Sequence, residues 1–205
     1  MSNHGLVYVV VDDESLRCSL QSLFQSVGFD VRGFGSAAEF LASDLGDANA
    51  CLVLDVRLPS MNGLEFQRKL NELGIRLPVI FISGFADVPM SVQGMKAGAV
   101  DFFTKPFRDQ DILDAVAAAL ASDRERRARW GVFKLLQDRF YTLSARERQV
   151  MALVVAGLLN KQVAVELVIS EVTVKIHRGN VMRKMGARTL AELVHMSEQL
   201  GEGAR

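Results

Sequence analysis

The feature that most constrains the fold is an alternation of short apolar runs and helical patterns over the first 120 residues. The apolar runs predict five strands, at 6–11, 29–34, 51–54, 79–82 and 100–104. Between them, apolar residues recur at spacings of three and four, which is typical of amphipathic helices. Nearly continuous apolar strands that alternate with helices predict a parallel sheet buried on both faces. We therefore expect an α/β fold built on a five-stranded, doubly wound parallel sheet.

The pattern changes near residue 122. The charged run 122–129 continues the preceding helix and suits a linker, and no β-rich run follows it. Ser144 and Glu147 have the S-x-x-E spacing of a capping box that opens a helix. Short helices joined by tight turns then indicate a small all-α helix-turn-helix domain. We predict a first domain at 1–121, a helical linker at 122–141 and a helix-turn-helix domain at 142–205.

The net charge of zero conceals an asymmetry between the two parts. Residues 1–120 carry nine Lys and Arg against fifteen Asp and Glu, and residues 121–205 carry fifteen against nine. A basic domain suits a polyanion such as nucleic acid, although solvated charged faces are the simpler alternative. Cys18 and Cys51 form no C-x-x-C pair, and the sequence contains no long apolar segment. The first apolar run has six residues and no basic region before it, so we predict no signal peptide. We expect a cytoplasmic protein without a membrane partner.

Polar residues gather where the predicted strands end. Asp12 and Asp13 follow the first strand, Asp55 the third, Ser83 the fourth and Lys105 the fifth. Because these ends share one edge of a parallel sheet, the side chains should meet in one crevice. Carboxylates there suit Mg²⁺, the ammonium and hydroxyl suit a phosphoryl group, and one carboxylate can act as the nucleophile. The alternative is that the acids only cap the following helices, with Lys105 as a counter-ion.

The residues around these strand ends resemble the receiver domain of two-component response regulators, which has a flavodoxin-like fold. The resemblance covers the first 120 residues and rests on four segments, namely Val11–Glu14, Leu54–Pro59 with Gly63, Ser83–Gly84 and Gly98–Pro106. It implies that Asp55 accepts a phosphoryl group from a sensor histidine kinase. It also implies that Asp12, Asp13, Asp55 and the main-chain carbonyl of Arg57 hold Mg²⁺.

The same resemblance implies a conformational switch. Ser83 takes the position of the switch hydroxyl, Lys105 that of the phosphate-contacting lysine, and Phe102 that of the switch aromatic. A cis bond is implied before Pro106, which X-Pro bonds tolerate. The phosphoryl group adds negative charge and acceptor oxygens, which would draw Ser83 and Lys105 inward and let Phe102 fill the space. Phe102 stands where many receivers carry tyrosine, and a plain packing role is the alternative.

The predicted helix 171–185 has two distinct faces on a helical wheel. Val174, Val181 and Met185 share the face expected to be buried, with Met182 and His177 at its edges; we favour packing over DNA contact for His177. The outward face carries two β-branched apolar residues beside cations, which suits a helix in the DNA major groove. A dimer interface on this face is the alternative. The outward residues are Val172, Lys175, Ile176, Gly179, Asn180 and Arg183, with Lys161, Thr173, Arg178 and Arg188 as expected phosphate contacts.

Residues 140–200 resemble the LuxR-type helix-turn-helix, and the order of the two domains resembles the FixJ/NarL class of response regulators. The segments that carry the resemblance are Ser144–Arg148, Ala156–Gly157, Asn160–Lys161, Glu171–His177 and Met182–Gly186. Gly179 departs from the larger side chains common in the family and costs about 1 kcal/mol of helix propensity relative to Ala. Close approach of the DNA to the helix and relaxed specificity at one base are both compatible with it.

The leading interpretation is a transcription regulator that phosphorylation converts into a DNA-binding homodimer on operator DNA, with RNA polymerase as a further candidate partner. A phosphohydrolase with an aspartate nucleophile is the competing enzyme class. Such an enzyme would need a general-acid carboxylate two residues after Asp55, where Arg57 stands. We therefore expect no turnover enzyme, beyond phosphorylation and slow dephosphorylation of the receiver itself. A regulator that works without phosphate is the third alternative.

Overall fold

The computed structural model describes residues 5–59, 61–84 and 88–202. It divides the chain into two compact units, Met1–Arg127 and Ala128–Arg205, which are described separately below.

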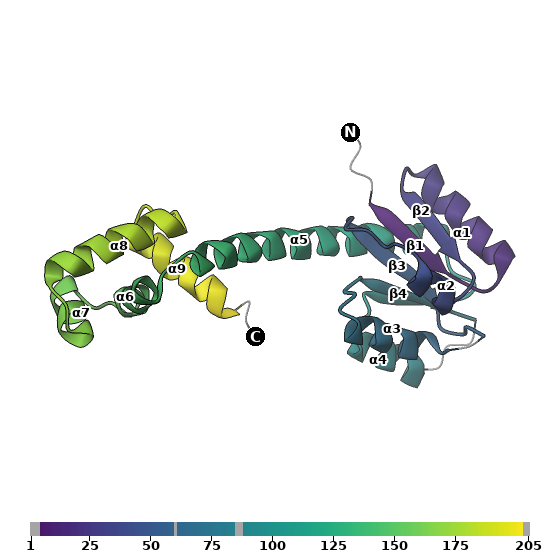
Figure 1. Cartoon of the computed structure of the whole chain (residues 1–205). Helices are drawn as coiled ribbons and strands as arrows, with labels where there is room; N and C mark the ends of the chain where they lie inside the picture. Colours follow the sequence, from purple (N-terminus) through teal and green to yellow (C-terminus); the bar gives the residue numbers. More distant parts are fainter. Residues whose placement is uncertain (1–4, 60, 85–87, 203–205) are drawn as a thin grey trace. The chain divides into compact units, whose positions relative to one another are not determined.

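The first unit is built on a parallel sheet in the order β2-β1-β3-β4-β5. Figure 1 labels β2, β1, β3 and β4 of this sheet. Its strands are β1 (Leu6–Val10), β2 (Asp30–Phe34), β3 (Ala50–Asp55), β4 (Val79–Ser83) and β5 (Asp101–Thr104). The order β2-β1-β3 places the first strand inside the sheet, so the chain winds to one side and then to the other. The prediction of five parallel strands is confirmed.

Helices cover both faces of this sheet. They are α1 (Glu14–Ser26), α2 (Ala37–Ala42), α3 (Gly63–Glu72), α4 (Val88–Lys96) and the first part of α5 (Asp109–Tyr141). Alternate residues of β1 enter different cores: Tyr8 and Val10 pack with α2 and α3, and Val7 and Val9 pack with α1 and α5. Because both faces are covered, β3 and β4 are buried along their whole length. The doubly wound arrangement is therefore confirmed.

Helix α5 contains the charged run that was predicted to be a linker. Within this run Asp123 is fully buried, and its carboxylate accepts hydrogen bonds from the backbone N–H of Ala50 at 3.1 Å, from Arg126 Nη2 at 2.5 Å and from Arg127 Nε at 2.7 Å. Arg127 also pairs with Asp47. This part of α5 is thus fastened to the start of β3, at the end of the strand opposite Asp55.

The second unit is helical throughout its described residues. Apart from the end of α5 it contains α6 (Ala145–Val155), α7 (Asn160–Leu167), α8 (Glu171–Met185) and α9 (Leu190–Glu202). The predicted capping box opens α6, because the Ser144 hydroxyl accepts from the N–H of Glu147 and the Glu147 carboxylate accepts from the N–H of Ser144. The core of the unit lies between α6, α7, α8 and α9, where Val150, Val163 and Leu193 are buried.

Val168 ends α7 in a conformation that suits few side chains. Its φ of 53° and ψ of 51° lie in the left-handed region, although valine is β-branched, and its side chain is 88% exposed. The left-handed conformation costs an L-residue about 1 to 2 kcal/mol, and asparagine tolerates it better. We expect Val168→Asn to raise the free energy of unfolding of this unit by about 1 kcal/mol, measured by urea denaturation.

Val165 provides the control for this substitution. It is also exposed but lies inside α7, where asparagine gains nothing from left-handed geometry. Val165→Asn should therefore leave the stability unchanged or lower it. An equal gain in stability from both variants would show that the gain comes from replacing an exposed apolar side chain by a polar one and not from relief of backbone strain at Val168.

Candidate functional site

The carboxyl edge of the sheet brings Asp55 and Lys105 together. Asp55 is the last residue of β3 and is buried, and Lys105 follows β5. The Lys105 ammonium donates to Asp55 Oδ2 at 2.5 Å, and the N–H of Arg57 donates to Oδ1 at 3.0 Å. A buried carboxylate held by an ammonium is strongly oriented, because each group satisfies the other. The sequence prediction that these two side chains meet is therefore confirmed.

Ser83 stands beside this pair at the end of β4. Its side chain is fully buried, and its carbonyl accepts a hydrogen bond from the N–H of Lys105 at 2.8 Å. This hydrogen bond holds the backbone of Ser83 beside that of Lys105, at the edge of the sheet where Asp55 also lies. The Lys105–Pro106 peptide bond is cis, as the sequence resemblance implied.

Gly63 allows α3 to begin against the end of β3. A Cβ at this position would lie 2.6 Å from the Asp55 carbonyl oxygen and 3.0 Å from the Val56 Cα. The N–H of Gly63 also donates to the Val56 carbonyl at 2.8 Å. Any larger residue would push α3 away from Asp55, so this glycine helps to shape the site.

Asp12 and Asp13 follow β1 and are exposed. Asp13 is the N-cap of α1, because its Oδ1 accepts from the N–H of Leu16 at 3.0 Å. The capping role that the sequence left as an alternative is therefore real for Asp13, and its second oxygen takes no part in the cap. Across residues 5–59, 61–84 and 88–202, no three acidic, His or Cys side chains are gathered closely enough to cage a metal ion.

This donor set nevertheless fits Mg²⁺. The carboxylates of Asp12, Asp13 and Asp55 and the carbonyl of Arg57 are hard oxygen ligands, and the first two are open to water. Mg²⁺ keeps several waters and is usually held by one or two carboxylates together with phosphate oxygens, rather than by a closed protein cage.

Phe102 on β5 is partly buried and packs against Phe81, with ring centroids 6.0 Å apart. Gly94 on α4 faces the same ring, because a Cβ there would lie 3.5 Å from Phe102 Cδ2 and 3.2 Å from Phe81. The aromatic ring therefore lies between β4 and α4, next to the strand that ends at Ser83.

Helix α8 of the second unit has the two faces that its sequence predicted. Val174, Val181 and Met185 are buried in the core, whereas Val172 and Ile176 are 67% and 59% exposed. The partly buried edge residue His177 has a buried Nδ1 without a partner among the described residues. Exposed apolar side chains that are grouped on one face among polar residues mark interaction surfaces, so the outward face of α8 is suited to contact with another molecule.

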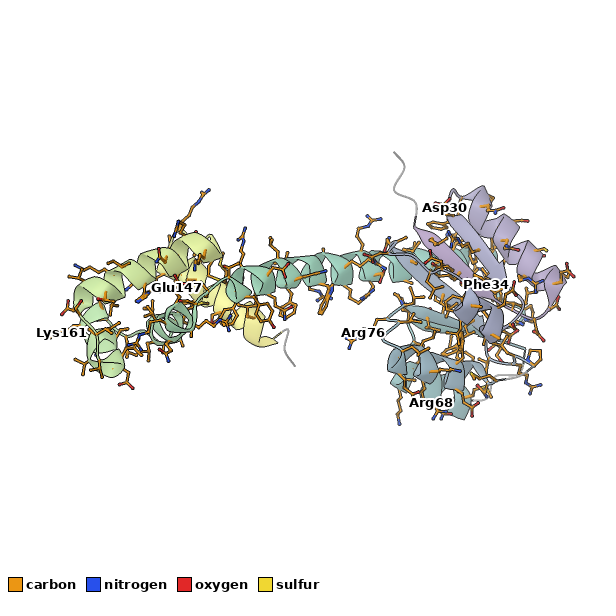
Figure 2. The ribbon with its side chains drawn as sticks, in the orientation of Figure 1. Asp30, Phe34, Arg68, Arg76, Glu147 and Lys161 are labelled. Atoms are coloured by element: carbon orange, nitrogen blue, oxygen red, sulfur yellow. The ribbon has the colours of Figure 1, made fainter. Side chains whose placement is uncertain are left out.

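The cations of this unit fall into two groups. Arg139 donates to the Met185 carbonyl at 2.9 Å, and Arg146 donates to the Leu167 carbonyl at 2.8 Å, so both stabilise the fold. By contrast, the side-chain ammonium groups of Lys175 on α8 and of Lys161 on α7 (Figure 2) form no hydrogen bond or ion pair with any described residue. Their charge is available to a polyanion.

Four of the other expected DNA contacts, Arg178, Arg183, Asn180 and Thr173, have partners within the protein. Arg178 donates to Asn160 Oδ1 at 2.9 Å, Arg183 donates to Asn180 Oδ1 at 3.0 Å, and the Thr173 hydroxyl lies 2.8 Å from the Ser170 hydroxyl. Because an arginine has five donors, the first two can contact phosphate while keeping these bonds. Arg188 is exposed beyond the end of α8.

An ion pair that the sequence did not predict fastens α8 to α6. The buried carboxylate of Glu147 accepts from Lys184 Nζ at 2.6 Å, where α6 faces α8 (Figure 2). Hydrogen bonds from Lys184 and from the N–H of Ser144 lower the pKa of Glu147 to about 2. The negative charge therefore persists across the physiological range and holds α8 against α6.

Comparisons with known proteins agree with both halves of this geometry. Residues 7–117 match the family described as "Response regulator receiver domain", and residues 141–197 match "Bacterial regulatory proteins, luxR family". The chain belongs to the two-component response regulators with a LuxR-type DNA-binding domain. It is a transcriptional regulator and not a metabolic enzyme, as the sequence indicated.

Several known proteins are similar to this chain over nearly its whole length. Nodulation protein W of Bradyrhizobium diazoefficiens is 56% identical over 203 residues, covering 99% of this chain and 89% of that protein. The transcriptional regulatory protein FixJ of Rhizobium meliloti is 45% identical over 197 residues, covering 96% and 97%. The solved structure of the response regulator StyR is 45% identical, covers 95% of this chain and 98% of that one, and has a TM-score of 0.85.

The structure also identifies residues whose importance the sequence did not reveal. In the sequence, Asp123 and Lys184 look like ordinary surface charges, and Glu147 is recognisable only as a capping-box residue. The one signal of a network is the pair of arginines three and four positions after Asp123. Among the described helices, none is long and apolar enough to span a membrane.

Proposed function

We propose that this response regulator is switched on by phosphorylation of Asp55 and then binds operator DNA as a homodimer through α8. The observation that carries the proposal is the buried Asp55 carboxylate, 2.5 Å from the Lys105 ammonium and next to the end of the strand that carries Ser83. Since DNA is the target, we place the protein in the cytoplasm.

In the proposed chemistry, an Asp55 carboxylate oxygen attacks the phosphorus of a phosphohistidine on a sensor kinase. The P–O bond forms as the P–N bond breaks, and the electron pair of that bond leaves with the imidazole. The Lys105 ammonium is in place to neutralise the added charge. Mg²⁺, held by Asp12, Asp13, Asp55 and the carbonyl of Arg57, would supply further charge neutralisation when bound.

The switch follows from the new acceptor oxygens. The phosphoryl group adds about 1.5 to 2 negative charges, and Ser83 and Lys105 stabilise it only in the state in which they contact its oxygens. The phosphoryl group therefore shifts the population toward that state. Phe102 responds because its ring lies between α4 and the strand that ends at Ser83. The surface formed by α4 and β5 then changes shape.

This surface is suited to dimerisation. Val92 and Met95 on α4 are exposed apolar side chains, 44% and 47% accessible. A symmetric receiver dimer would bring two copies of α8 to two half-sites, about one helical turn of DNA apart. Binding of both half-sites raises affinity, because the second contact occurs at a high effective concentration.

On DNA, we propose that the outward face of α8 reads bases and that its surroundings contact phosphates. Lys175 can reach guanine O6 and N7, and Val172 and Ile176 can contact thymine methyl groups. The further contacts are Lys161, Thr173, Arg178, Gly179, Asn180, Arg183 and Arg188.

The experiment that tests this function measures mass and DNA affinity on the same sample. Light scattering in the presence of Mg²⁺ should give a monomer that becomes a dimer after a small phosphodonor is added. A duplex selected from a random-sequence library by the treated protein should then bind more tightly after treatment than before. Unchanged mass together with unchanged affinity would contradict the phosphorylation switch.

A further inference from the structure

Gly179 is a glycine that the fold of its own domain does not require. It lies inside α8 with no left-handed φ, and a Cβ added to it would meet no atom within 4 Å. Gly63 is different, because a Cβ there would collide with the Asp55 carbonyl oxygen at 2.6 Å. Glycine destabilises the interior of an exposed helix relative to alanine, so the protein loses helix stability at Gly179 without a packing gain.

The position of Gly179 indicates which contact compensates for the lost helix stability. It is exposed at the centre of the outward face, one turn after Lys175 and one turn before Arg183. The apolar neighbours on this face, Val172 and Ile176, have short side chains. Such side chains contact base edges only if the helix backbone lies close to the floor of the groove. A bulky residue at 179 would hold the helix away from that floor.

We propose that Gly179 is the point at which α8 lies closest to the DNA, with base-pair edges against the helix backbone. This inference rests on the DNA-binding function proposed above and adds a specificity device to it. The missing side chain lets Val172 and Ile176 reach thymine methyl groups. The preference for particular bases then depends on how deeply α8 lies in the major groove, as well as on the contact from Lys175.

Gly131 provides a matched control. It is an exposed helical glycine in the same unit, on α5, and a Cβ added there also meets nothing within 4 Å. Gly131→Ala and Gly179→Ala should each raise the melting temperature by about 4 °C, since both improve helix propensity. Only the second should affect DNA.

The test uses full-length, phosphodonor-treated protein and the duplex that the wild type selects from a random library. We expect Gly179→Ala to weaken binding to this duplex by about tenfold and Gly179→Leu to weaken it further, whereas Gly131→Ala binds as the wild type does. Replacing thymine by uracil removes the C5 methyl groups. This replacement should weaken the wild type severalfold and have little effect on Gly179→Ala, whose helix no longer reaches them.

The outcomes separate this inference from the function on which it rests. If the wild type selects a duplex and Gly179→Ala binds it equally well or better, the close approach is wrong, although the DNA-binding function stands. If Gly131→Ala weakens binding as much as Gly179→Ala, the effect is not one of contact and the inference is again wrong. If the wild type selects no duplex, both proposals are overturned.

Discussion

Replacing Asp55 with asparagine is expected to abolish both dimerisation and the gain in DNA affinity that a phosphodonor produces. The amide keeps the shape of the carboxylate but lacks the nucleophilic oxygen, and it removes the negative charge that faces Lys105 at 2.5 Å. Because Asp55 is the buried carboxylate at the convergence of β3, β4 and β5, we expect complete loss. Light scattering measures the loss of dimerisation, and fluorescence anisotropy with the selected duplex measures the loss of the gain in DNA affinity.

Asp30 supplies the control for this experiment. It is an exposed aspartate at the start of β2, at the opposite edge of the sheet from Asp55. Asp30→Asn removes the same charge and should dimerise and bind DNA as the wild type does. Intact-mass spectrometry should detect the added phosphoryl group in the wild type and in Asp30→Asn only. A phosphodonor-induced dimer of Asp55→Asn would show that another residue accepts the phosphoryl group or that phosphate acts without it.

The parts of the fold that the sequence predicts well are those that depend on local periodicity. The central strands β3 and β4 are recognisable because both of their faces are buried, so nearly every residue in them is apolar, as in Val79–Ser83. Helix α8 is recognisable because Val174, Val181 and Met185 repeat at helical spacing, and all three are buried. The ends of strands depend on partners that are distant in the sequence. Strand β3 begins at Ala50, whose backbone N–H donates a hydrogen bond to Asp123, and a hydropathy pattern cannot predict that bond.

The candidate site shows the same division. The carboxyl ends of parallel strands must share one edge, so the meeting of Asp55 and Lys105 could be predicted without coordinates. The close approach of Gly63 to the Asp55 carbonyl could not, because it depends on how α3 packs. The pairing of Glu147 with Lys184 likewise joins residues 37 positions apart. The periodicity of one helix can place a charged residue on its exposed face, although a second helix, distant in the sequence, buries that residue in the folded protein.

Asp123 carries the second large effect, because substituting it should destabilise the first unit and the part of α5 that it fastens. Asp123→Ala leaves the buried N–H of Ala50 without its acceptor and leaves Arg126 and Arg127 without their shared carboxylate. Loss of a buried charged acceptor costs about 3 kcal/mol. Urea denaturation followed by circular dichroism should show this loss, and hydrogen exchange should increase in the segment 121–130.

The pH dependence of this loss follows from the pKa of Asp123. Burial raises that pKa, but hydrogen bonds from Arg126, Ala50 and Arg127 outweigh burial, and the pKa is lowered overall. A lowered carboxyl pKa stabilises the fold above about pH 4, the usual value for aspartate, and this contribution is lost as the pH falls through the folded-state pKa. The difference in stability between wild type and Asp123→Ala should therefore shrink in acid.

Asp114 distinguishes a specific anchor from a general effect of charge on α5. It is an exposed aspartate on the same helix, and its carboxylate accepts a hydrogen bond only from Gln110 among the described residues. Asp114→Ala should change the free energy of unfolding by less than about 0.5 kcal/mol and leave the exchange of 121–130 unaltered. If both alanine variants behaved alike, the network around Asp123 would contribute no more than surface charge. If hydrogen exchange in 121–130 increased in Asp123→Ala only, the contact between Asp123 and the start of β3 would be shown to stabilise this part of α5.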